Sequence, residues 1–345
     1  MGEARPLGTC DDPLQQTYDL AMLDLDGVVY VGRSAVPGAA DDLGAAAESG
    51  MNLAFVTNNA ARPPRVVAEH LTELGVTAAP EDVVTSAQAA ARVLAERLDD
   101  GAKVFVIGGE GLFEALEERG LRPVQRLAAQ PEAVVSGFHP DLRWATVIEG
   151  AIGVRNGLPW VASNADMTVP TPLGPGPGNG VLVRAVAEFA EATPTVAGKP
   201  ESPLFHETRR RVGGEHALVV GDRLDTDIEG ARRAGYDSLL VMTGVTDLAV
   251  LVGAPREQRP TYLAAGLAAL GRPHPAPERS GSAWTQEGWT AQVSEGTLRV
   301  EGSGSADAWW RVVACAAWTH VDDTGEIAGT TGLAPPQPGE DGDGR

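Results

Sequence analysis

The stretch "YDLAMLDLDGVVYVG", Tyr18 to Gly32, begins as an apolar run and then places two aspartates on either side of one leucine. Side chains two residues apart in a strand lie on the same face of a sheet. A strand that is apolar on both faces belongs inside a parallel sheet, whose ligands bind beyond the carboxyl ends of the strands. Asp24 and Asp26 are therefore expected at a ligand crevice, and Gly27 lets the chain turn away from it.

Short apolar runs alternate with helix-period segments along most of the chain. We expect strands at residues 53–57, 103–109, 133–137, 159–164, 216–222 and 237–244, and helices at 63–75, 111–120, 143–157 and 226–235. Strands that alternate with helices of this length indicate parallel sheets with crossover helices. The predicted fold class is therefore α/β, with a doubly wound, Rossmann-like parallel-sheet core.

Composition excludes several classes of partner. The net charge of −20 makes nucleic acid and anionic membranes poor partners. Cys10 and Cys315 are isolated, so neither a disulfide framework nor a zinc site is expected, and a reducing cytoplasm is the plain interpretation. The first 16 residues lack the apolar segment of a signal peptide, and no apolar run is long enough to span a membrane.

Three further predicted strands end in polar side chains of the kinds that bind phosphate or metal: Thr57, Asn58 and Asn59 after "LAFV", Lys199 after "TPTVAG", and Asp222 and Asp227 in "GDRLDTD". Clustered carboxylates repel one another unless a cation lies among them. All-oxygen ligation suits Mg²⁺, which binds through one or two carboxylates and a substrate phosphate. Brought to one crevice, these residues describe a magnesium-dependent phosphoryl-transfer site.

Each of these residues also has a purely structural explanation. Asp26 suits a turn beside a glycine, and the "TNN" segment suits the N-cap of the helix that follows it. Asp227 lies in a capping-box pattern, "TDIE", where a carboxylate favours the helix dipole, and Lys199 suits an exposed surface. Each alternative stays open by itself, but all four together require four coincidences, which favours the site.

The segments "DLDGVVY", "TNN", "GKP" and "GDRLDTD", in this order, resemble the four motifs of the haloacid dehalogenase superfamily of phosphatases. The resemblance implies that Asp24 is the nucleophile that forms an aspartyl-phosphate, because a carboxylate can attack without a base. Asp26 would protonate the leaving alkoxide and then activate the hydrolytic water. An aspartate at this second position favours phosphatases over the transport ATPases and dehalogenases of the superfamily.

The resemblance also implies roles for the other site residues. The implied phosphate-binding residues are Thr57, Asn58, Asn59 and Lys199, and the implied Mg²⁺ ligands are Asp24, the backbone carbonyl of Asp26 and Asp222, with Asp227 orienting the water shell of the metal. Lys199 would offset charge between the phosphate and Asp24, because lysine is a compact point charge. A reaction of this kind needs Mg²⁺ as its cofactor.

About 140 residues separate the second and third motifs. In the superfamily this position holds the large α/β cap of the p-nitrophenylphosphatase-like subfamily, which "TNNAARPP", "TSAQAAARVL" and "VASNAD" also resemble. Such a cap admits small phosphorylated metabolites and excludes bulk water.

The expected organisation is a flexible N-terminus (1–16), a core (17–82 and 180–270), a cap (83–179) that ends in a glycine- and proline-rich connection at 171–180, a linker (271–282), a small α+β extension (283–322) and a disordered tail (323–345).

The extension is predicted to hold a β-hairpin at 288–302 and a helix at 306–322, with three tryptophans packed against the hairpin. It resembles the short N-acetyltransferase-like region of some bacterial glycerol-3-phosphate phosphatases, so glycerol 3-phosphate is the favoured substrate. Glycolate 2-phosphate, pyridoxal phosphate and sugar phosphates stay open as alternatives. So do a homodimer, which is common among related proteins, and a regulatory binding module on a phosphatase-like scaffold.

Overall fold

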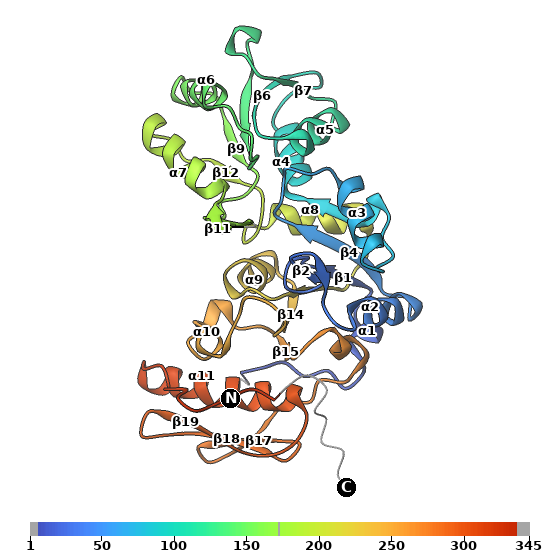
Figure 1. Cartoon of the computed structure of the whole chain (residues 1–345), viewed down its shortest axis with the longest axis vertical. Coiled ribbons are helices and arrows are strands. Elements are labelled where there is room, and N and C mark those ends of the chain that lie inside the picture. The colour runs from blue at the N-terminus through green and yellow to red at the C-terminus, as the bar shows by residue number, and fades with distance from the viewer. Residues whose placement is uncertain (1–5, 172, 337–345) are drawn as a thin grey trace. The chain divides into compact units, whose positions relative to one another are not determined.

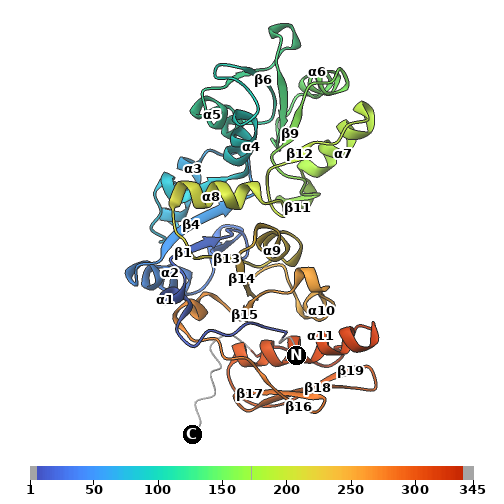
Figure 2. The ribbon, with the colours of Figure 1, turned by 180° about the vertical axis from the view of Figure 1, so that it is seen from behind.

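The computed structural model describes residues 6–171 and 173–336. The chain divides into two compact units, unit 1 (residues 1–53 and 214–345) and unit 2 (residues 54–213). Strand β4 (Asn52–Thr57) begins in unit 1 and ends in unit 2. Figures 1 and 2 show the elements from opposite sides. The parallel sheets and their helices confirm the predicted α/β class.

The parallel sheet of unit 1 runs in the order β15 (Tyr262–Ala264), β14 (Asp237–Val241), β13 (Ala217–Gly221), β1 (Leu20–Leu23). All four residues of β1 are buried, as their apolar pattern predicts. The parallel register pairs Leu23 with Val220, so the segments that follow β1 and β13 both leave the sheet at its carboxyl end. Asp24 and Asp26, the two aspartates of the first motif, follow β1 at this carboxyl end.

The connections of unit 1 carry short elements: α1 (Leu14–Thr17), β2 (Tyr30–Val31), β3 (Ser34–Ala35), α2 (Ala39–Glu48), the π-helical turn η3 (Leu224–Ile228), α9 (Glu229–Ala234), α10 (Leu248–Val252), η4 (Arg256–Gln258) and η5 (Leu267–Gly271). The turn η3 replaces the beginning of the helix that the sequence predicts at 226–235. Among residues 6–171 and 173–336, no helix is both long and apolar enough to cross a bilayer.

Unit 1 ends in a four-stranded antiparallel sheet of β16 (Glu278–Ser280), β17 (Ala283–Gln286), β18 (Trp289–Ser294) and β19 (Thr297–Gly302). Helix α11 (Ala306–Thr324) lies along one face of this sheet, as Figures 1 and 2 show. The predicted hairpin and helix are thus confirmed. The helix begins where Ser305 Oγ accepts a hydrogen bond from the backbone nitrogen of Ala308, as is common at an N-cap.

The three tryptophans of α11 are buried in a hydrophobic core that also contains residues of β14, β15 and α10. Trp318 Nε1 donates to the carbonyl oxygen of Leu251 at 2.8 Å, so its one polar atom is satisfied inside this core. Leu224 and Ile228 of η3 belong to the same core. The tryptophans therefore pack against the parallel sheet as well as against the hairpin.

Two segments that the sequence predicts to be flexible or to serve as a linker are ordered where the structure describes them. Leu7 and Leu14 are buried, and the backbone nitrogen of Gly8 donates to Thr261 at 2.8 Å. Within the expected linker at 271–282, His274 is buried and β16 pairs with β17. The expectations failed because a few apolar residues in a polar segment are enough to anchor it when a core lies beneath.

The expected disordered tail is also ordered as far as residue 336. Helix α11 continues to Thr324, and the backbone nitrogen of Leu298 donates to the carbonyl of Gly329 at 2.9 Å. Ala328 is buried beside this contact. The tail therefore adds to the edge of β19, because its backbone pairs with groups that an edge strand leaves open. Residues 1–5 and 337–345 lie outside the described part of the chain.

Unit 2 contains the parallel pair β4 and β5 (Val83–Thr85) with α3 (Pro64–Glu73), η1 (Pro80–Asp82), α4 (Ser86–Ala95) and α8 (Pro203–Val212). Its second, five-stranded parallel sheet has the order β12 (Thr195–Val196), β9 (Trp160–Ala162), β8 (Ala133–Ser136), β6 (Lys103–Ile107), β7 (Arg122–Val124). Helices α6 (Trp144–Arg155) and α7 (Asn179–Ala190) form a core on one face of this sheet. Figure 1 shows α4 and α5 (Glu110–Glu118) on the other face.

The glycine- and proline-rich segment at 171–180 is predicted to be a turn-rich connection, and it contains more regular structure than that. Its residues complete an antiparallel hairpin of β10 (Thr168–Thr171) and β11 (Gly174–Pro177) and then begin α7. Proline is tolerated in a two-stranded ribbon, where each strand has only one neighbour and half of its backbone groups face away from the ladder. The domain boundaries expected at 82/83 and 179/180 stay a prediction.

His274 and Arg311 form a buried polar pair in the core of unit 1. Arg311 Nη2 donates to His274 Nδ1 at 3.0 Å, and Arg311 Nε donates to the carbonyl of Leu263 at 2.9 Å. His274 Nε2 lies 3.0 Å from the carbonyl of Ala269, so the neutral ring with its hydrogen on Nε2 satisfies both bonds. Burial, followed by the charge of Arg311, lowers the pKa of His274 to about 4.

We expect the free energy of unfolding to fall as the pH drops from about 6.5 to about 4. The unfolded chain takes up a proton on this histidine near pH 6.5, whereas the folded chain resists protonation until about pH 4, so acid favours unfolding. The full effect approaches about 3 kcal/mol, because one pKa unit corresponds to about 1.4 kcal/mol. Urea unfolding followed by tryptophan fluorescence at pH 7 and at pH 4.5 measures the loss.

His274→Gln keeps one donor and one acceptor but does not titrate, so it should lose less stability between these pH values than the wild type. His216→Gln, at an exposed histidine of the same unit, is the matched control and should retain the wild-type loss. Equal acid sensitivity of the two variants would contradict the assignment.

Candidate active site

Three predicted site carboxylates meet at the carboxyl ends of β1 and β13. One carboxylate oxygen from each of Asp24, Asp222 and Asp227 lies within 4.8 Å of the other two. Asp222 and Asp227 are fully buried, and Asp24 is partly exposed. Negative charges so close together in a buried site repel one another strongly. The oxygen donors and their charge fit a hard divalent cation such as Mg²⁺.

The backbone around Asp222 fixes the orientation of its carboxylate. The backbone nitrogen of Val245 donates to Oδ2 at 2.6 Å, and Thr246 Oγ1 donates to the Asp222 carbonyl at 2.5 Å. Gly27 and Gly244 enclose the same carboxylate, and a Cβ atom at either position would overlap it. Gly27 also has a φ of +87°, which other residues rarely adopt. The two glycines therefore make the space that Asp222 occupies.

Asp227 is held by the turn η3 rather than by a helix cap. Its Oδ2 accepts a hydrogen bond from the backbone nitrogen of Arg223 at 3.1 Å. The backbone nitrogens of Asp227 and Ile228 both lie 3.2 Å from the Arg223 carbonyl, which widens the turn. In the described structure neither η3 nor α9 begins with a side-chain cap bond, so the capping-box explanation of "TDIE" is wrong.

Asp26 lies in a tight turn two residues after Asp24. Its side chain is exposed, and the backbone nitrogen of Gly27 donates to the Tyr30 carbonyl at 2.8 Å, which closes the turn. This geometry agrees with the turn explanation, and the proton-transfer role of the exposed Asp26 carboxylate stays a prediction. The predicted metal contact of Asp26 uses its backbone carbonyl, and it stays a prediction.

The remaining predicted residues belong to unit 2, where β4 ends in Thr57. Thr57 is buried, and its Oγ1 accepts a hydrogen bond from the backbone nitrogen of Asn59 at 3.0 Å. Asn59 Oδ1 in turn accepts from the backbone nitrogen of Ala61 at 2.8 Å. These local bonds are those expected of a polar turn before a helix. The structure thus gives Asn59 a role in holding this loop, and its contact with phosphate stays a prediction.

The side chain of Asn58 is bound to the backbone of Lys199. Asn58 Oδ1 accepts from the Lys199 nitrogen at 2.8 Å, and Asn58 Nδ2 donates to the Lys199 carbonyl at 3.1 Å. Nδ2 also lies 3.1 Å from each carboxylate oxygen of Asp166. Both ends of the amide are therefore used inside the protein. We infer that the Asn58 side chain positions Lys199. Because that side chain is already bonded, only the backbone nitrogen of Asn58 is suited to bind a phosphoryl oxygen.

Lys199 is 4% exposed, so the alternative of an exposed surface lysine is wrong. Its Nζ lies 3.5 Å from the carbonyl of Val56, near the end of β4. A buried ammonium group needs several acceptors or a negative partner. Within unit 2, Lys199 is thus placed with Thr57 and Asn58 by contacts that connect residues 141 positions apart.

The backbone carbonyl of Asn58 is bound by residues that were not among the predicted site residues. The Asn58 carbonyl accepts from Ser86 Oγ at 2.6 Å and from Asn164 Nδ2 at 2.7 Å. Asn179 Nδ2 donates to the Asn164 carbonyl at 2.7 Å, which extends the network to the first turn of α7. The segments "TSAQ" and "VASNAD" contain Ser86, Asn164 and Asp166, but they served only as a family resemblance. Their polar residues inside apolar runs were the available signal.

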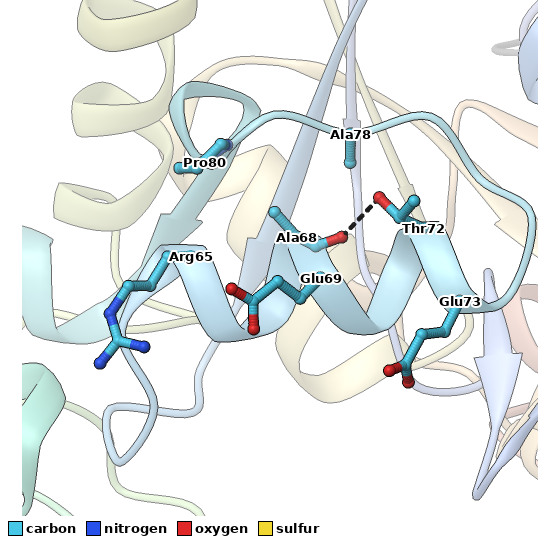
Figure 3. Close-up of a pocket in the computed structure, with 7 residues that line it drawn as sticks. All are labelled: Arg65, Ala68, Glu69, Thr72, Glu73, Ala78 and Pro80. Carbon is cyan, nitrogen blue, oxygen red and sulfur yellow. Dashed lines mark hydrogen bonds between the residues drawn. The ribbon is translucent and has the colours of Figure 1, made fainter.

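A hollow beside α3 lies elsewhere in unit 2. It is lined by Arg65, Ala68, Glu69, Thr72, Glu73, Ala78 and Pro80. Figure 3 shows the charged side chains along the outer side of α3, with Thr72 Oγ1 donating to the Ala68 carbonyl. None of the predicted site residues is among those that line it, so it plays no part in the site.

We expect Gly244→Ala to weaken Mg²⁺ binding about tenfold or more, because the new methyl group displaces the Asp222 carboxylate. Titration calorimetry of the full chain with Mg²⁺ measures this, and circular dichroism checks the fold. Gly44→Ala is the matched control, since a Cβ there meets no atom within 4 Å and alanine suits the interior of α2. Unchanged Mg²⁺ affinity in a folded Gly244→Ala variant would contradict the proposed site.

Comparison with known proteins also points to the haloacid dehalogenase hydrolases. Residues 21–122 match a family model described as haloacid dehalogenase-like hydrolase, and residues 196–270 match a second one described as HAD-hydrolase-like. The chain is 44% identical to the D-glycerol 3-phosphate phosphatase of Mycobacterium tuberculosis over 294 residues, which are 85% of this chain and 81% of that protein.

Solved structures agree with the sequence comparison. The glycerol phosphate phosphatase of Mycobacterium tuberculosis in complex with magnesium has a TM-score of 0.81 and 42% identity, over 89% of this chain and 92% of that chain. A double mutant of the thermostable NPPase of Geobacillus stearothermophilus has a TM-score of 0.66 and 32% identity, over 73% of this chain and 97% of that chain. The chain therefore belongs to the haloacid dehalogenase family of hydrolases, among its phosphatases.

Proposed function

We propose that the protein is a Mg²⁺-dependent phosphatase that hydrolyses glycerol 3-phosphate in the cytoplasm through an aspartyl-phosphate on Asp24. The observation that carries the proposal is the meeting of three carboxylates within 4.8 Å at the ends of β1 and β13. The similarity to a D-glycerol 3-phosphate phosphatase supports the substrate. The predicted likeness of residues 283–322 to an N-acetyltransferase-like region belongs to the same proposal, as an accessory element.

Asp24, Asp222 and the backbone carbonyl of Asp26 would hold Mg²⁺, and Asp227 would orient its water shell. When bound, the cation neutralises charge on the phosphoryl oxygens and on the carboxylates around it. The partly exposed Asp24 is the member of the cluster that substrate can reach, while Asp222 and Asp227 are fully buried. This difference in exposure suits Asp24 to attack phosphorus, while the buried Asp222 and Asp227 would keep the metal and its water shell in place.

The reaction needs two displacements at phosphorus. A carboxylate oxygen of Asp24 forms a bond to phosphorus while the bond from phosphorus to the glycerol oxygen breaks, and Asp26 gives its proton to the leaving alkoxide. Water then attacks the same phosphorus, Asp26 takes the proton from this water, and the bond between phosphorus and Asp24 breaks. Inorganic phosphate leaves, and both aspartates return to their first state.

The residues of unit 2 complete the proposed site. The Thr57 hydroxyl and the backbone nitrogen of Asn58 would bind phosphoryl oxygens, and the Lys199 ammonium group would stabilise the negative charge that grows during each displacement. The Asn58 side chain would hold Lys199 in place through its two bonds to the Lys199 backbone. The proposal requires these groups and the carboxylates of unit 1 to act on one phosphoryl group.

The function is tested by phosphate release from a panel of glycerol 3-phosphate, glycolate 2-phosphate, pyridoxal phosphate and sugar phosphates with Mg²⁺. We expect the highest kcat/KM for glycerol 3-phosphate, since this ratio reports differential transition-state binding. Asp24→Asn should lower kcat about 10³-fold or more, because the amide is a poor nucleophile. Asp225→Asn, at an exposed aspartate of η3, is the matched control and should keep wild-type activity.

A folded Asp24→Asn variant with substantial turnover would overturn the mechanism. A sugar phosphate with the highest kcat/KM would overturn the substrate and leave the phosphatase class intact. Absence of turnover on the whole panel would favour the regulatory binding module instead.

The positioning role of Asn58 has its own test. Asn58→Asp faces the Asp166 carboxylate at about the present 3.1 Å and loses the donor to the Lys199 carbonyl, so we expect kcat to fall more than KM rises. Adding Asp166→Asn restores a donor and acceptor pair and should recover part of the lost kcat. Steady-state kinetics at several pH values measures both effects. A double variant as slow as Asn58→Asp, or a single variant with wild-type kcat, would contradict this role.

A further inference from the structure

His139 follows β8 at the carboxyl end of the five-stranded sheet of unit 2. Strand β8 ends at Ser136, three residues before this histidine. Strands β9 and β12 run parallel to β8 and end shortly before Asn164 and Lys199. In open α/β sheets, ligands bind beyond the carboxyl ends of the strands. His139 therefore lies at the end of the sheet where a ligand of unit 2 is expected.

Two glycines bring the end of β8 against the loop that follows β4, which carries the proposed phosphate-binding groups. A Cβ atom on Gly137 would lie 3.2 Å from Ala60 Cβ. A Cβ atom on Gly109 would lie 2.5 Å from His139 Cδ2 and 3.4 Å from the Ala61 carbonyl oxygen. The imidazole of His139 therefore packs on the Gly109 backbone, next to the loop after β4, and this position has room for the ring only because residue 109 lacks a side chain.

The side chain of His139 closes a turn in the same way as two asparagines of unit 2. His139 Nδ1 accepts a hydrogen bond from the backbone nitrogen of Asp141 at 3.2 Å. Asn59 Oδ1 and Asn164 Oδ1 each accept from the backbone nitrogen two residues further on, at 2.8 Å and 3.2 Å. Asparagine is a common residue for closing such a turn. Closure of the turn therefore does not by itself require a histidine at this position.

The second ring nitrogen of His139 distinguishes it from Asn164. Because Nδ1 is the acceptor of the turn bond, the neutral ring carries its hydrogen on Nε2. Asn164 uses the donor end of its side chain inside the protein, where Nδ2 binds the Asn58 carbonyl at 2.7 Å. Nε2 of His139 has no acceptor among residues 6–171 and 173–336, and the side chain is partly exposed. The ring therefore presents a hydrogen-bond donor that a ligand can use.

We propose that His139 is a specificity-determining residue that donates from Nε2 to a hydroxyl oxygen in the alcohol part of the substrate. This inference rests on the proposed function, in which Thr57, the Asn58 backbone nitrogen and Lys199 bind the phosphoryl group. The alcohol of a polyol phosphate carries hydroxyl groups close to its phosphate ester, so a donor beside the phosphate-binding loop suits it. An alkyl alcohol would leave this donor without a partner and lose transition-state stabilisation.

The test compares glycerol 3-phosphate with propyl phosphate, which differs from it only in lacking the hydroxyl groups. His139→Asn keeps an acceptor for the turn but has a shorter side chain, so its donor does not reach as far as Nε2. With the full chain and Mg²⁺, we expect kcat/KM for glycerol 3-phosphate to fall about tenfold or more, and that for propyl phosphate to stay within about twofold of the wild type. His70→Asn, on α3, is the matched control and should change neither value.

A second variant, His139→Phe, keeps a ring on Gly109 but removes both the turn acceptor and the donor. It should lower the ratio of the two kcat/KM values at least as much as His139→Asn does, and circular dichroism checks that both variants are folded. Equal losses on the two substrates, or wild-type kcat/KM for glycerol 3-phosphate in folded His139→Asn, would overturn the inference and leave His139 as a turn residue. Absence of turnover of both substrates by the wild type would instead overturn the proposed function, and this inference with it.

Discussion

The mutual repulsion of Asp24, Asp222 and Asp227 is the constraint on which the rest of unit 1 depends. Three carboxylates within 4.8 Å, two of them fully buried, destabilise a fold that has no cation to offset them. The parallel register of β1 and β13 makes the approach unavoidable, and glycines 27 and 244 provide the space. In the proposed function, a bound cation offsets this electrostatic cost.

At position 199 the shape of the basic side chain matters as well as its charge. Among the 27 lysines and arginines of the chain, only Lys103 and Lys199 are lysines. An arginine at 199 would bring five donors into a 4% exposed position, and each donor left without an acceptor would cost stability. The ammonium group has three donors on a narrow stem. The clasp of Asn58 on the Lys199 backbone then fixes where that stem begins.

The local part of this architecture follows from the sequence. The buried "LAML" strand, the alternating strands and helices, and the aspartates after the strands were predictable because each depends on a few neighbouring residues. The distant contacts were not. The bond between Asn58 and Lys199 joins positions 141 residues apart, and Leu224 and Ile228 of the π-helical turn η3 are buried in a core that includes residues of α11. Local sequence patterns do not show which distant residues will be in contact.

The C-terminal segment also shows that distant contacts are not predictable from local sequence. Residues 323–336 are predicted to be disordered because their composition is polar, yet the edge of β19 offers backbone groups with which non-proline residues can pair, and Gly329 uses them. Polar composition predicts disorder only when no edge or core lies within reach. In this chain the core of unit 1 extends from the parallel sheet into the antiparallel one through Trp318 and its bond to Leu251. Segments near its margin are therefore ordered by what they lie against rather than by what they contain.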